Sequence, residues 1–204
     1  MAVLNTGLAK TSAGDFTIDY SCRFEDGDTA YLSKTPAGDG NRKTWTFSCW
    51  IKRGNSSAGG IQFLIGAPTY ADGLYFQVGD ELVINVASTN TITTQKFRDP
   101  TAWYHIVLAV DTTDGVAADR RKVYVNGSRI TDFGTEANPS LNSDSFINSA
   151  AVHKIGTHPT SSLPYDGYMA EVHFIDGTQL TPSSFGESGD YGEWKPIKVA
   201  GLTY

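Results

Sequence analysis

Regular alternation of side chains is the feature that most restricts how this chain folds. In "WYHIVLAVD" every second residue from Tyr104 to Val110 falls on one apolar face of an extended chain. A period of two is typical of a half-buried strand. The nearby "KVYVNGSRI" turns at Asn126-Gly127, the strongest short signal of a hairpin, because both turn residues must adopt a positive φ. These runs predict antiparallel strands joined by tight turns.

Other segments have the same character. In "TWTFSCWIKRG" alternate residues from Phe47 to Ile51 share a face, and "FTIDYSCRFEDGD" alternates over residues 18–24. "GLYFQVGDELVINVAS" indicates two strands around a turn at Gly79-Asp80. "IQFLIGA", "HKIGTH" and "GYMAEVHFIDG" are further strand candidates. About ten or more short strands with regular turns predict an all-β sandwich or barrel.

The chain divides into one domain and two end segments. Its 204 residues show no internal repeat and no linker, which favours a single β domain over residues 16–186. Residues 1–15 and 187–204 contain apolar side chains without a strand period. We expect both to anchor the protein to neighbouring subunits, and the alternative is that they are frayed ends.

One helical turn is predicted near residues 181–186, in "LTPSSFG". Thr181 is placed to cap it, and Pro182 suits the first helical position. Leu180 and Phe185 occupy the two positions of a hydrophobic staple.

Charge and hydropathy exclude several classes of partner. Sixteen basic and 22 acidic residues leave a net charge of −6, and the basic residues are scattered. This argues against a surface for nucleic acid or anionic membrane. No segment approaches the roughly 18 apolar residues of a membrane span, and the N-terminus lacks the pattern of a signal peptide. We expect a soluble protein with no nucleic-acid partner and no membrane insertion.

Cys22 and Cys49 each lie in an apolar alternating run. We interpret them as free thiols buried in neighbouring strands, since buried cysteine commonly behaves as a small hydrophobe. The alternative is a disulfide, which requires Cα atoms within about 7 Å.

Four segments in order resemble a known family: "WTFSCWIKRG", "WYHIVLAVD", "KVYVNGSRI" and "IGT…YDGYMAEVHFIDG". Together they resemble the laminin-G/pentraxin branch of the concanavalin A-like lectin/glucanase superfamily. The tail "GYMAEVHFIDGTQLTPSSFGE…GEWKP" is similar to modules of structural proteins in marine tailed bacteriophages. The resemblance implies a jelly roll of two packed antiparallel sheets with loops along its rims.

Catalytic patterns are missing. The hydrolytic branch of the superfamily carries a Glu-x-Asp-x-x-Glu strand, which would aim a nucleophile and an acid at the sugar. The acids at Glu25–Asp28 straddle a glycine turn, and alternation places Glu171 and Asp176 on opposite faces. The histidines are dispersed, at His105, His153, His158 and His173. We expect a protein that is not an enzyme and has no zinc site.

Sugar binding needs an exposed aromatic ring flanked by polar groups, because a pyranose presents an apolar face for stacking. The candidate rim residues are Tyr70, Asp72, Tyr75, Asn126, Tyr165 and Asp166. For Tyr70 and Tyr165, a sugar platform and simple packing remain open alternatives. Trp50 and Trp103 are assigned to packing of the sandwich.

Calcium is implied by the resemblance but not required by it. Relatives often bind this ion at a loop rim through oxygen ligands. Asp111 and Asp114 in "DTTDG" are the candidate ligands, and the alternative is ordinary turn chemistry.

The phage-like tail implies a non-enzymatic structural or adhesion protein of a tailed-phage virion, as a tail fibre, spike or head decoration. Its partners would be other virion proteins and further copies of itself, at the particle surface. The alternative is a glycan-binding module, with or without calcium, that recognises host surface polysaccharide.

Overall fold

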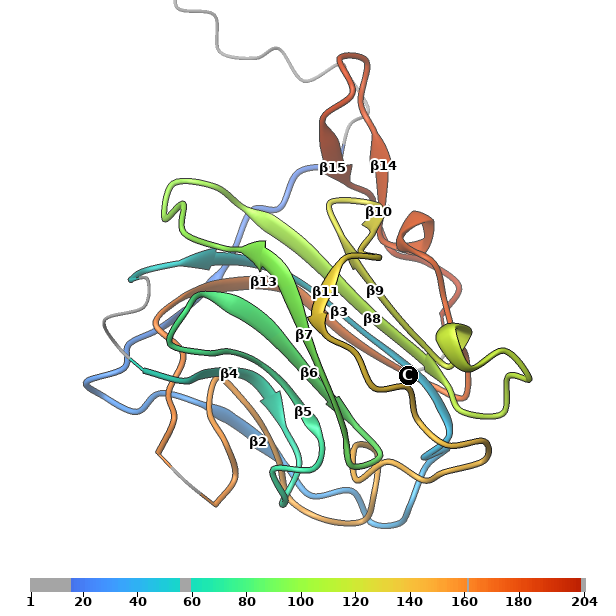
Figure 1. The fold of residues 1–204 in the computed structure, drawn as a ribbon. Coiled ribbons are helices and arrows are strands. Elements are labelled where there is room, and N and C mark those ends of the chain that lie inside the picture. The colour runs from blue at the N-terminus through green and yellow to red at the C-terminus, as the bar shows by residue number, and fades with distance from the viewer. Residues whose placement is uncertain (1–15, 56–59, 161, 203–204) are drawn as a thin grey trace, which may run out of the picture.

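The computed structural model describes residues 16–55, 60–160 and 162–202, and two antiparallel sheets pack face to face in it (Figure 1). In order across the six-stranded sheet lie β1 (Cys22–Phe24), β13 (Gly167–Asp176), β3 (Thr44–Arg53), β8 (Tyr104–Asp111), β9 (Arg121–Val125) and β10 (Ser128–Arg129). Across the seven-stranded sheet lie β11 (Phe133–Thr135), β7 (Thr89–Lys96), β6 (Glu81–Val86), β5 (Gly73–Phe76), β4 (Gln62–Gly66), β12 (His153–Ile155) and β2 (Leu32–Lys34). The predicted all-β, two-sheet jelly roll is confirmed.

One hairpin and two helical turns complete the described chain. Strands β14 (Gly186–Ser188) and β15 (Trp194–Pro196) form a separate hairpin. The two helical turns are the 3₁₀ segments η1 (Ala117–Asp119) and η2 (Pro182–Ser184). η2 confirms the predicted turn, but the Thr181 side chain does not cap it, and instead its hydroxyl meets the Ser183 hydroxyl at 2.8 Å.

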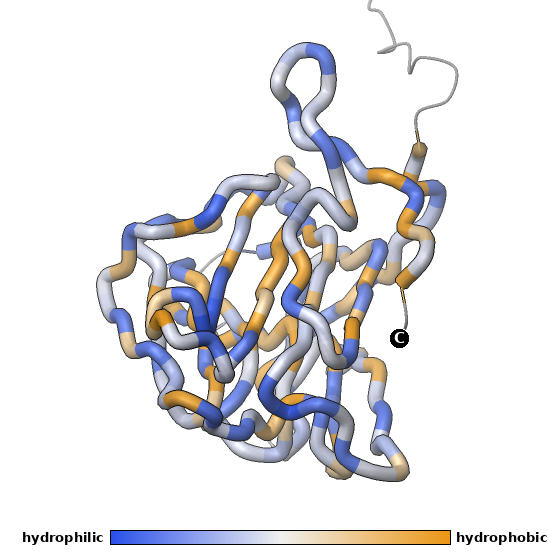
Figure 2. The backbone as a smooth tube through the Cα atoms, turned by 90° about the vertical axis from the view of Figure 1, so that its right-hand side faces the viewer, coloured by the Kyte–Doolittle hydropathy of each residue, from blue (hydrophilic) through white to orange (hydrophobic). Residues whose placement is uncertain are grey.

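Strand β3 follows the predicted alternation. One of its faces, from Trp45 through Phe47 and Cys49 to Ile51, is at most 1% exposed and lies in the main core. The intervening residues, Trp50 among them, face away from that core. Figure 2 shows the apolar segments gathered on the inner strands, with hydrophilic segments in the loops. The core therefore lies between the two sheets, as side-chain alternation requires.

Both predicted turns are present. Asn126 and Gly127 have φ of 47° and 78° and join β9 to β10. Asp80 has φ of 71° in the turn between β5 and β6.

A β-bulge interrupts β13. Trp50 pairs with Ala170 and Ser48 with His173, so residues 171–172 lie opposite a single residue of β3. Glu171 accommodates the extra residue with a left-handed φ of 45°. The bulge reverses the alternation of β13, which single-strand periodicity does not reveal.

The C-terminal segment packs on the outer face of the six-stranded sheet. Val107, Ile175 and Phe185 form a second buried cluster there, and Val199 and Leu202 pack against it. The β14–β15 hairpin projects beyond the sandwich in Figures 1 and 2. The described part of the expected anchor 187–204 thus contacts its own domain, while the other expected anchor, residues 1–15, lies outside the described residues.

The N-terminal strand is shorter than alternation predicts. Only Cys22–Phe24 pairs, and Tyr20 is 89% exposed. Both cysteines are free, as expected, but Cys22 is exposed and only Cys49 is buried. The expectation of two buried thiols in neighbouring strands is wrong, because β13 lies between β1 and β3.

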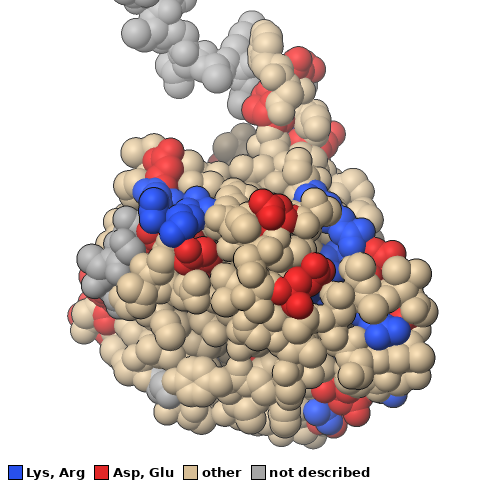
Figure 3. Space-filling model, in the orientation of Figure 1, with Lys and Arg blue, Asp and Glu red and all other residues tan. Residues whose placement is uncertain are grey.

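Charged side chains do not gather by sign on the face drawn in Figure 3, where basic and acidic residues are interspersed. Among the described residues there is also no helix with the length and apolar character needed to cross a bilayer.

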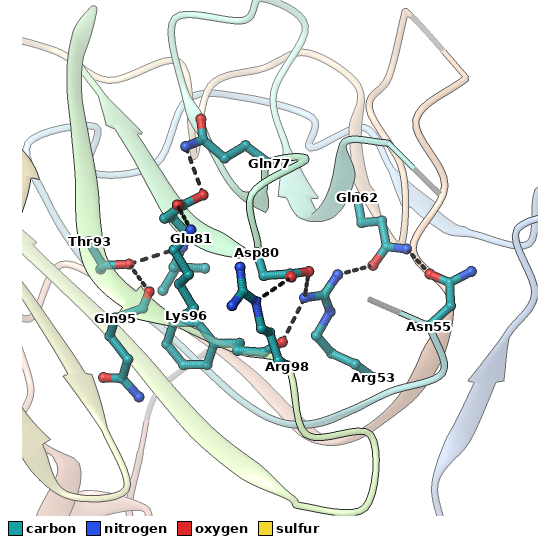
Figure 4. Close-up of polar contacts among 12 residues, drawn as sticks. Arg53, Asn55, Gln62, Gln77, Asp80, Glu81, Thr93, Gln95, Lys96 and Arg98 are labelled. Carbon is teal, nitrogen blue, oxygen red and sulfur yellow. Dashed lines mark hydrogen bonds and ion pairs between the residues drawn. The ribbon is translucent and has the colours of Figure 1, made fainter. Parts of the chain in front are cut away.

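A buried ion pair joins the two sheets (Figure 4). Arg53, at the end of β3, bonds Asp80 in the β5–β6 turn at 2.8 Å, and both side chains are 1% exposed. The guanidinium also donates to the carbonyl of Phe97 at 2.7 Å and to Gln62 Oε1 at 3.1 Å. The exposed Arg98 reaches the second oxygen of Asp80 at 3.1 Å. Arg53 therefore fixes the end of one sheet against a turn of the other.

Arg53→Leu is expected to lower the free energy of unfolding by about 3 kcal/mol, because it leaves the Asp80 carboxylate buried with its main partner removed. Arg98→Ala is the matched control, since Arg98 is 61% exposed and its pair with Asp80 is worth less than about 1 kcal/mol. Urea denaturation of the two variants measures the difference. Equal losses would show that burial of the pair is unimportant.

Candidate functional site

A cleft opens on the outer face of the six-stranded sheet. Its floor includes Trp50 of β3 and Ala170 of β13, which pair across the two strands, and His105 of β8 pairs with Trp50 on the other side. The His105 ring stacks on the Trp50 ring with centroids 4.9 Å apart and planes at 22°. On the other side Ala170 has only a methyl group, which leaves space beside the indole.

Aromatic side chains from distant parts of the chain form the walls. Trp103, immediately before β8, is 39% exposed, and Trp194 comes from β15. Residues 18–21 line the opposite edge, and Figure 1 shows this N-terminal segment passing the base of the β14–β15 hairpin. The cleft is open to solvent on one side and has a volume of about 310 Å³. We call it the tryptophan cleft and define it by Trp50, Trp103 and Trp194.

The two inner indoles differ in their hydrogen bonding. Trp194 Nε1 donates to His105 Nδ1 at 2.9 Å, and His105 Nε2 lies 2.8 Å from Ser48 Oγ. An indole N–H can only donate, so Nδ1 is the acceptor and the imidazole proton is on Nε2. Trp50 is 7% exposed, and its Nε1 is buried with no partner among the described residues. A buried donor of this kind gains when a bound molecule supplies an acceptor.

His105 is neutral in this setting. Burial lowers its pKa to about 4, and the nearby His173 adds to the effect. The imidazole therefore keeps its acceptor nitrogen for Trp194 at neutral pH.

The chemistry of the cleft suits binding better than bond cleavage. Indole faces stack on the apolar faces of sugar rings, and the free Trp50 N–H matches a hydroxyl or carbonyl oxygen. Of the described residues that line the cleft, Asp19 is the only acid. Glycoside hydrolysis by the usual route needs two carboxylates.

Two of the predicted rim residues meet on the outer side of the seven-stranded sheet. Tyr70 and Tyr75 both contact the buried Phe63, with ring centroids 6.2 and 4.5 Å away. Tyr70 also stacks on His158 at 4.1 Å and remains 49% exposed. Tyr70 is thus an available aromatic platform, although it lies on the sheet opposite the tryptophan cleft.

Asp72 is not a rim ligand. Its side chain is buried, and the carboxylate accepts the backbone N–H groups of Ala87 and Phe146, which belong to two separate loops. Burial raises the pKa of Asp72 to about 6, against the lowering effect of those N–H groups. Asp72 therefore holds loops together and offers no free oxygen to a sugar.

Tyr165 and Asp166 are also internal. Tyr165 is 0% exposed, lies in the core and donates its hydroxyl to the Lys52 carbonyl at 3.0 Å. Packing, rather than a sugar platform, is its role. Asp166 is 6% exposed and bonds Arg23 at 2.9 Å.

Asn126 supports the tryptophan cleft from behind. Its side-chain oxygen accepts the backbone N–H of His105 at 2.8 Å. The residue therefore braces β8.

The candidate calcium ligands do not fit a metal site. Asp111 accepts the Thr113 hydroxyl at 2.6 Å, and Asp114 accepts the Val116 N–H at 2.8 Å, as in ordinary turns. Among the described residues the one acidic trio within ligand distance consists of Glu25, Asp26 and Asp166. Arg23 already bonds two of its members, Glu25 and Asp166. We derive no role for calcium from either group.

The three cleft tryptophans are the site residues that sequence reasoning missed, because Trp50 and Trp103 were assigned to packing of the sandwich and Trp194 fell in the expected anchor 187–204. The assignment to the interior of the sandwich is wrong for Trp50 and Trp103. The signal was present, since Trp50 stands between Cys49 and Ile51, both of which face the core. A strict period of two puts Trp50 on the outer face.

Asp72→Ala is expected to lower the free energy of unfolding by about 2–4 kcal/mol, because the buried N–H groups of Ala87 and Phe146 lose their acceptor. Asp114→Ala removes one turn hydrogen bond and should cost less than about 1 kcal/mol. Urea denaturation at pH 7.5, where Asp72 is ionised, compares the two. If Asp72→Ala is as mild as its control, Asp72 does not hold these loops.

Comparisons with known proteins agree with this architecture. None of the curated protein sequences matches the chain. Among solved structures, a pentraxin from Limulus polyphemus has TM-score 0.51 and 18% identity, over 74% of this chain and 71% of that one. The mouse laminin α1 domains LG4-5 have TM-score 0.53 and 15% identity, over 77% of this chain and 41% of that one.

Tailspike protein 2 of Escherichia coli O157:H7 bacteriophage CAB120 has TM-score 0.54 and 11% identity, over 81% of this chain and 23% of that one. This chain thus spans less than half of the laminin fragment and about a quarter of the tailspike. At these identities the likenesses show the fold alone. The family model for the concanavalin A-like lectin/glucanases superfamily matches residues 26–184. The chain belongs to that superfamily.

Proposed function

We propose that this protein is a non-enzymatic adhesion module that binds carbohydrate in the tryptophan cleft. The observation that carries the proposal is the cleft lined by Trp50, Trp103 and Trp194, and the Nε1–H of Trp50 is buried with no partner among the described residues. Lectin-like jelly rolls provide the setting, but the fold does not choose the ligand. The chemistry of the cleft indicates the ligand, because it combines flat apolar rings with one donor that lacks an acceptor.

The size of the cleft limits what it holds. Its volume of about 310 Å³ is at the lower end of the range of roughly 300–1,000 Å³ for small-molecule sites. A short segment of a glycan fits this space better than a long stretch. Neutral sugars with equatorial hydroxyls are favoured, because their C–H groups form apolar faces for the indole rings.

The proposed setting is the virion of a tailed phage, where the protein serves as a fibre, spike or head-decoration component. Two observations support it: the resemblance of the tail "GYMAEVHFIDGTQLTPSSFGE…GEWKP" to modules of phage structural proteins, and the fold shared with part of a phage tailspike. Its partners there are other virion proteins and further copies of itself. Many copies on one particle make weak individual sites effective through avidity.

The absence of catalysis is part of the proposal. Glu171 lies 3.1 Å from the His173 ring, whereas Asp176 bonds Asn148 at 2.6 Å. These two acids have separate partners and do not face a common substrate position. We also propose that binding needs no calcium, since Arg23 already neutralises part of the acidic trio.

Trp103→Ala is expected to weaken binding about tenfold on an array of bacterial surface glycans, equivalent to about 1.4 kcal/mol. Loss of one stacked ring accounts for a change of this order. Tyr70→Ala removes an exposed ring from the opposite sheet and should leave affinity unchanged, as should EDTA. The reverse pattern, with Tyr70 sensitive and Trp103 not, would move the site to the seven-stranded sheet.

Mass spectrometry of purified phage particles is expected to detect this chain in stoichiometric copies. A virion component is assembled in fixed numbers, so its abundance relative to the major capsid protein should be constant between preparations. A chain confined to the infected-cell lysate would contradict the virion setting while leaving carbohydrate binding intact.

A further inference from the structure

We infer that His105 is the positioning residue of the tryptophan cleft. By holding Trp194, it keeps the C-terminal hairpin, residues 186–196, in place as one wall of the binding site. The inference rests on the proposed carbohydrate binding. It deepens that proposal by assigning control of the site to a residue that no ligand touches.

His105 lies between two of the three cleft indoles. It stacks on Trp50 with centroids 4.9 Å apart and planes at 22°, and it meets Trp194 edge to edge, with centroids 6.0 Å apart and planes at 15°. The ring is 1% exposed and is held at Nε2 by Ser48. Asn126 holds its backbone N–H. Because these contacts fix the His105 ring, the ring sets the positions of the Trp50 and Trp194 indoles.

The Trp194 side chain of the hairpin packs directly against the backbone of two glycines. A Cβ added to Gly127 would lie 2.5 Å from the Trp194 ring, and one added to Gly186 would lie 2.7 Å from it. Gly127 also has a left-handed φ of 78°. The indole thus rests directly on the β9–β10 turn, and its one hydrogen bond, to His105, fixes its rotation in that seat.

Hydrogen bonding divides the two indole donors between structure and ligand. The N–H of Trp194 donates to His105. The N–H of Trp50 has no acceptor among the described residues, and we assign it to a bound molecule. Removing the acceptor on His105 would release Trp194 and open the wall. The cleft would then lose a stacking face although Trp50 and Trp103 remained in place.

Acid should have the same effect as removing the acceptor. A protonated imidazole donates at both nitrogens, so its Nδ1–H would face the Trp194 N–H. The titratable groups near His105 are His173, which bonds Glu171, and Lys195 beside Trp194, while β3 presents the neutral Ser48 and Trp50. The folded-state pKa of His105, about 4, lies below its ordinary 6.5. Stability from this group is therefore complete above pH 6.5 and is lost as the pH falls towards 4.

The test compares His105→Leu, which has no acceptor, with His105→Asn, whose amide oxygen can replace Nδ1. The first readout is the Trp194 indole N–H signal in the NMR spectrum of the unliganded protein, assigned with Trp194→Phe. In His105→Leu the signal should shift, and its exchange with solvent should accelerate at least about tenfold, as expected when a protecting bond is lost. His105→Asn should restore most of the protection.

The second readout is affinity for cellotetraose, a neutral probe whose glucose rings carry C–H groups on both faces. We expect His105→Leu to weaken binding about tenfold and His105→Asn less than about threefold. If His105→Leu does not fold, Trp194→Phe replaces it, since it keeps an aromatic ring and removes the donor. That variant should bind about threefold more weakly, and proteinase K should cut the hairpin faster than in the unaltered protein.

The two proposals fail in different ways. An unaltered Trp194 signal and exchange rate in His105→Leu would overturn the positioning role whatever the ligand. So would equal losses of affinity in the Leu and Asn variants. If the unaltered protein binds neither cellotetraose nor any glycan on the array, the proposed function fails, and the indole signal still decides whether His105 holds the hairpin.

Discussion

The register of β3 is the constraint on which the rest of the structure depends. Its inner face supplies Phe47 and Cys49 to the core, and at its end Arg53 reaches the β5–β6 turn of the opposite sheet. Its outer face carries Trp50 on the floor of the cleft. A slip of one residue would exchange these faces, placing an indole in the core and exposing the arginine's partners. One strand therefore determines both how the sheets pack and where the proposed ligand binds.

The cleft depends on a third layer outside the sandwich. The C-terminal segment covers the six-stranded sheet around Val107 and Phe185, and it delivers Trp194 to a position beside His105. The sandwich alone would present Trp50 on an open sheet face, with too little concavity to hold a small ligand. Adding the hairpin converts this surface into an open cleft. This arrangement places the proposed function on the face of a sheet, away from the loop rim that sequence reasoning favoured.

Local patterns in the sequence were enough to predict the strands, the Asn126-Gly127 turn and the turn at Pro182, because each depends on neighbouring residues. The site was not predictable in this way. Trp194 and His105 are 89 residues apart, and nothing local indicates that they meet. The bulge at Glu171 reverses the alternation of β13. Asp72 was a candidate rim residue, yet long-range contacts bury it.

In the proposed binding mode a sugar lies against the cleft indoles and accepts the N–H of Trp50. The most direct measurement is a titration of the protein with its bound glycan, followed through the four tryptophan indole N–H signals by NMR. We expect the largest shift, and new protection from solvent exchange, at Trp50 Nε1–H. Unchanged indole signals, with shifts confined to residues around Tyr70, would contradict it.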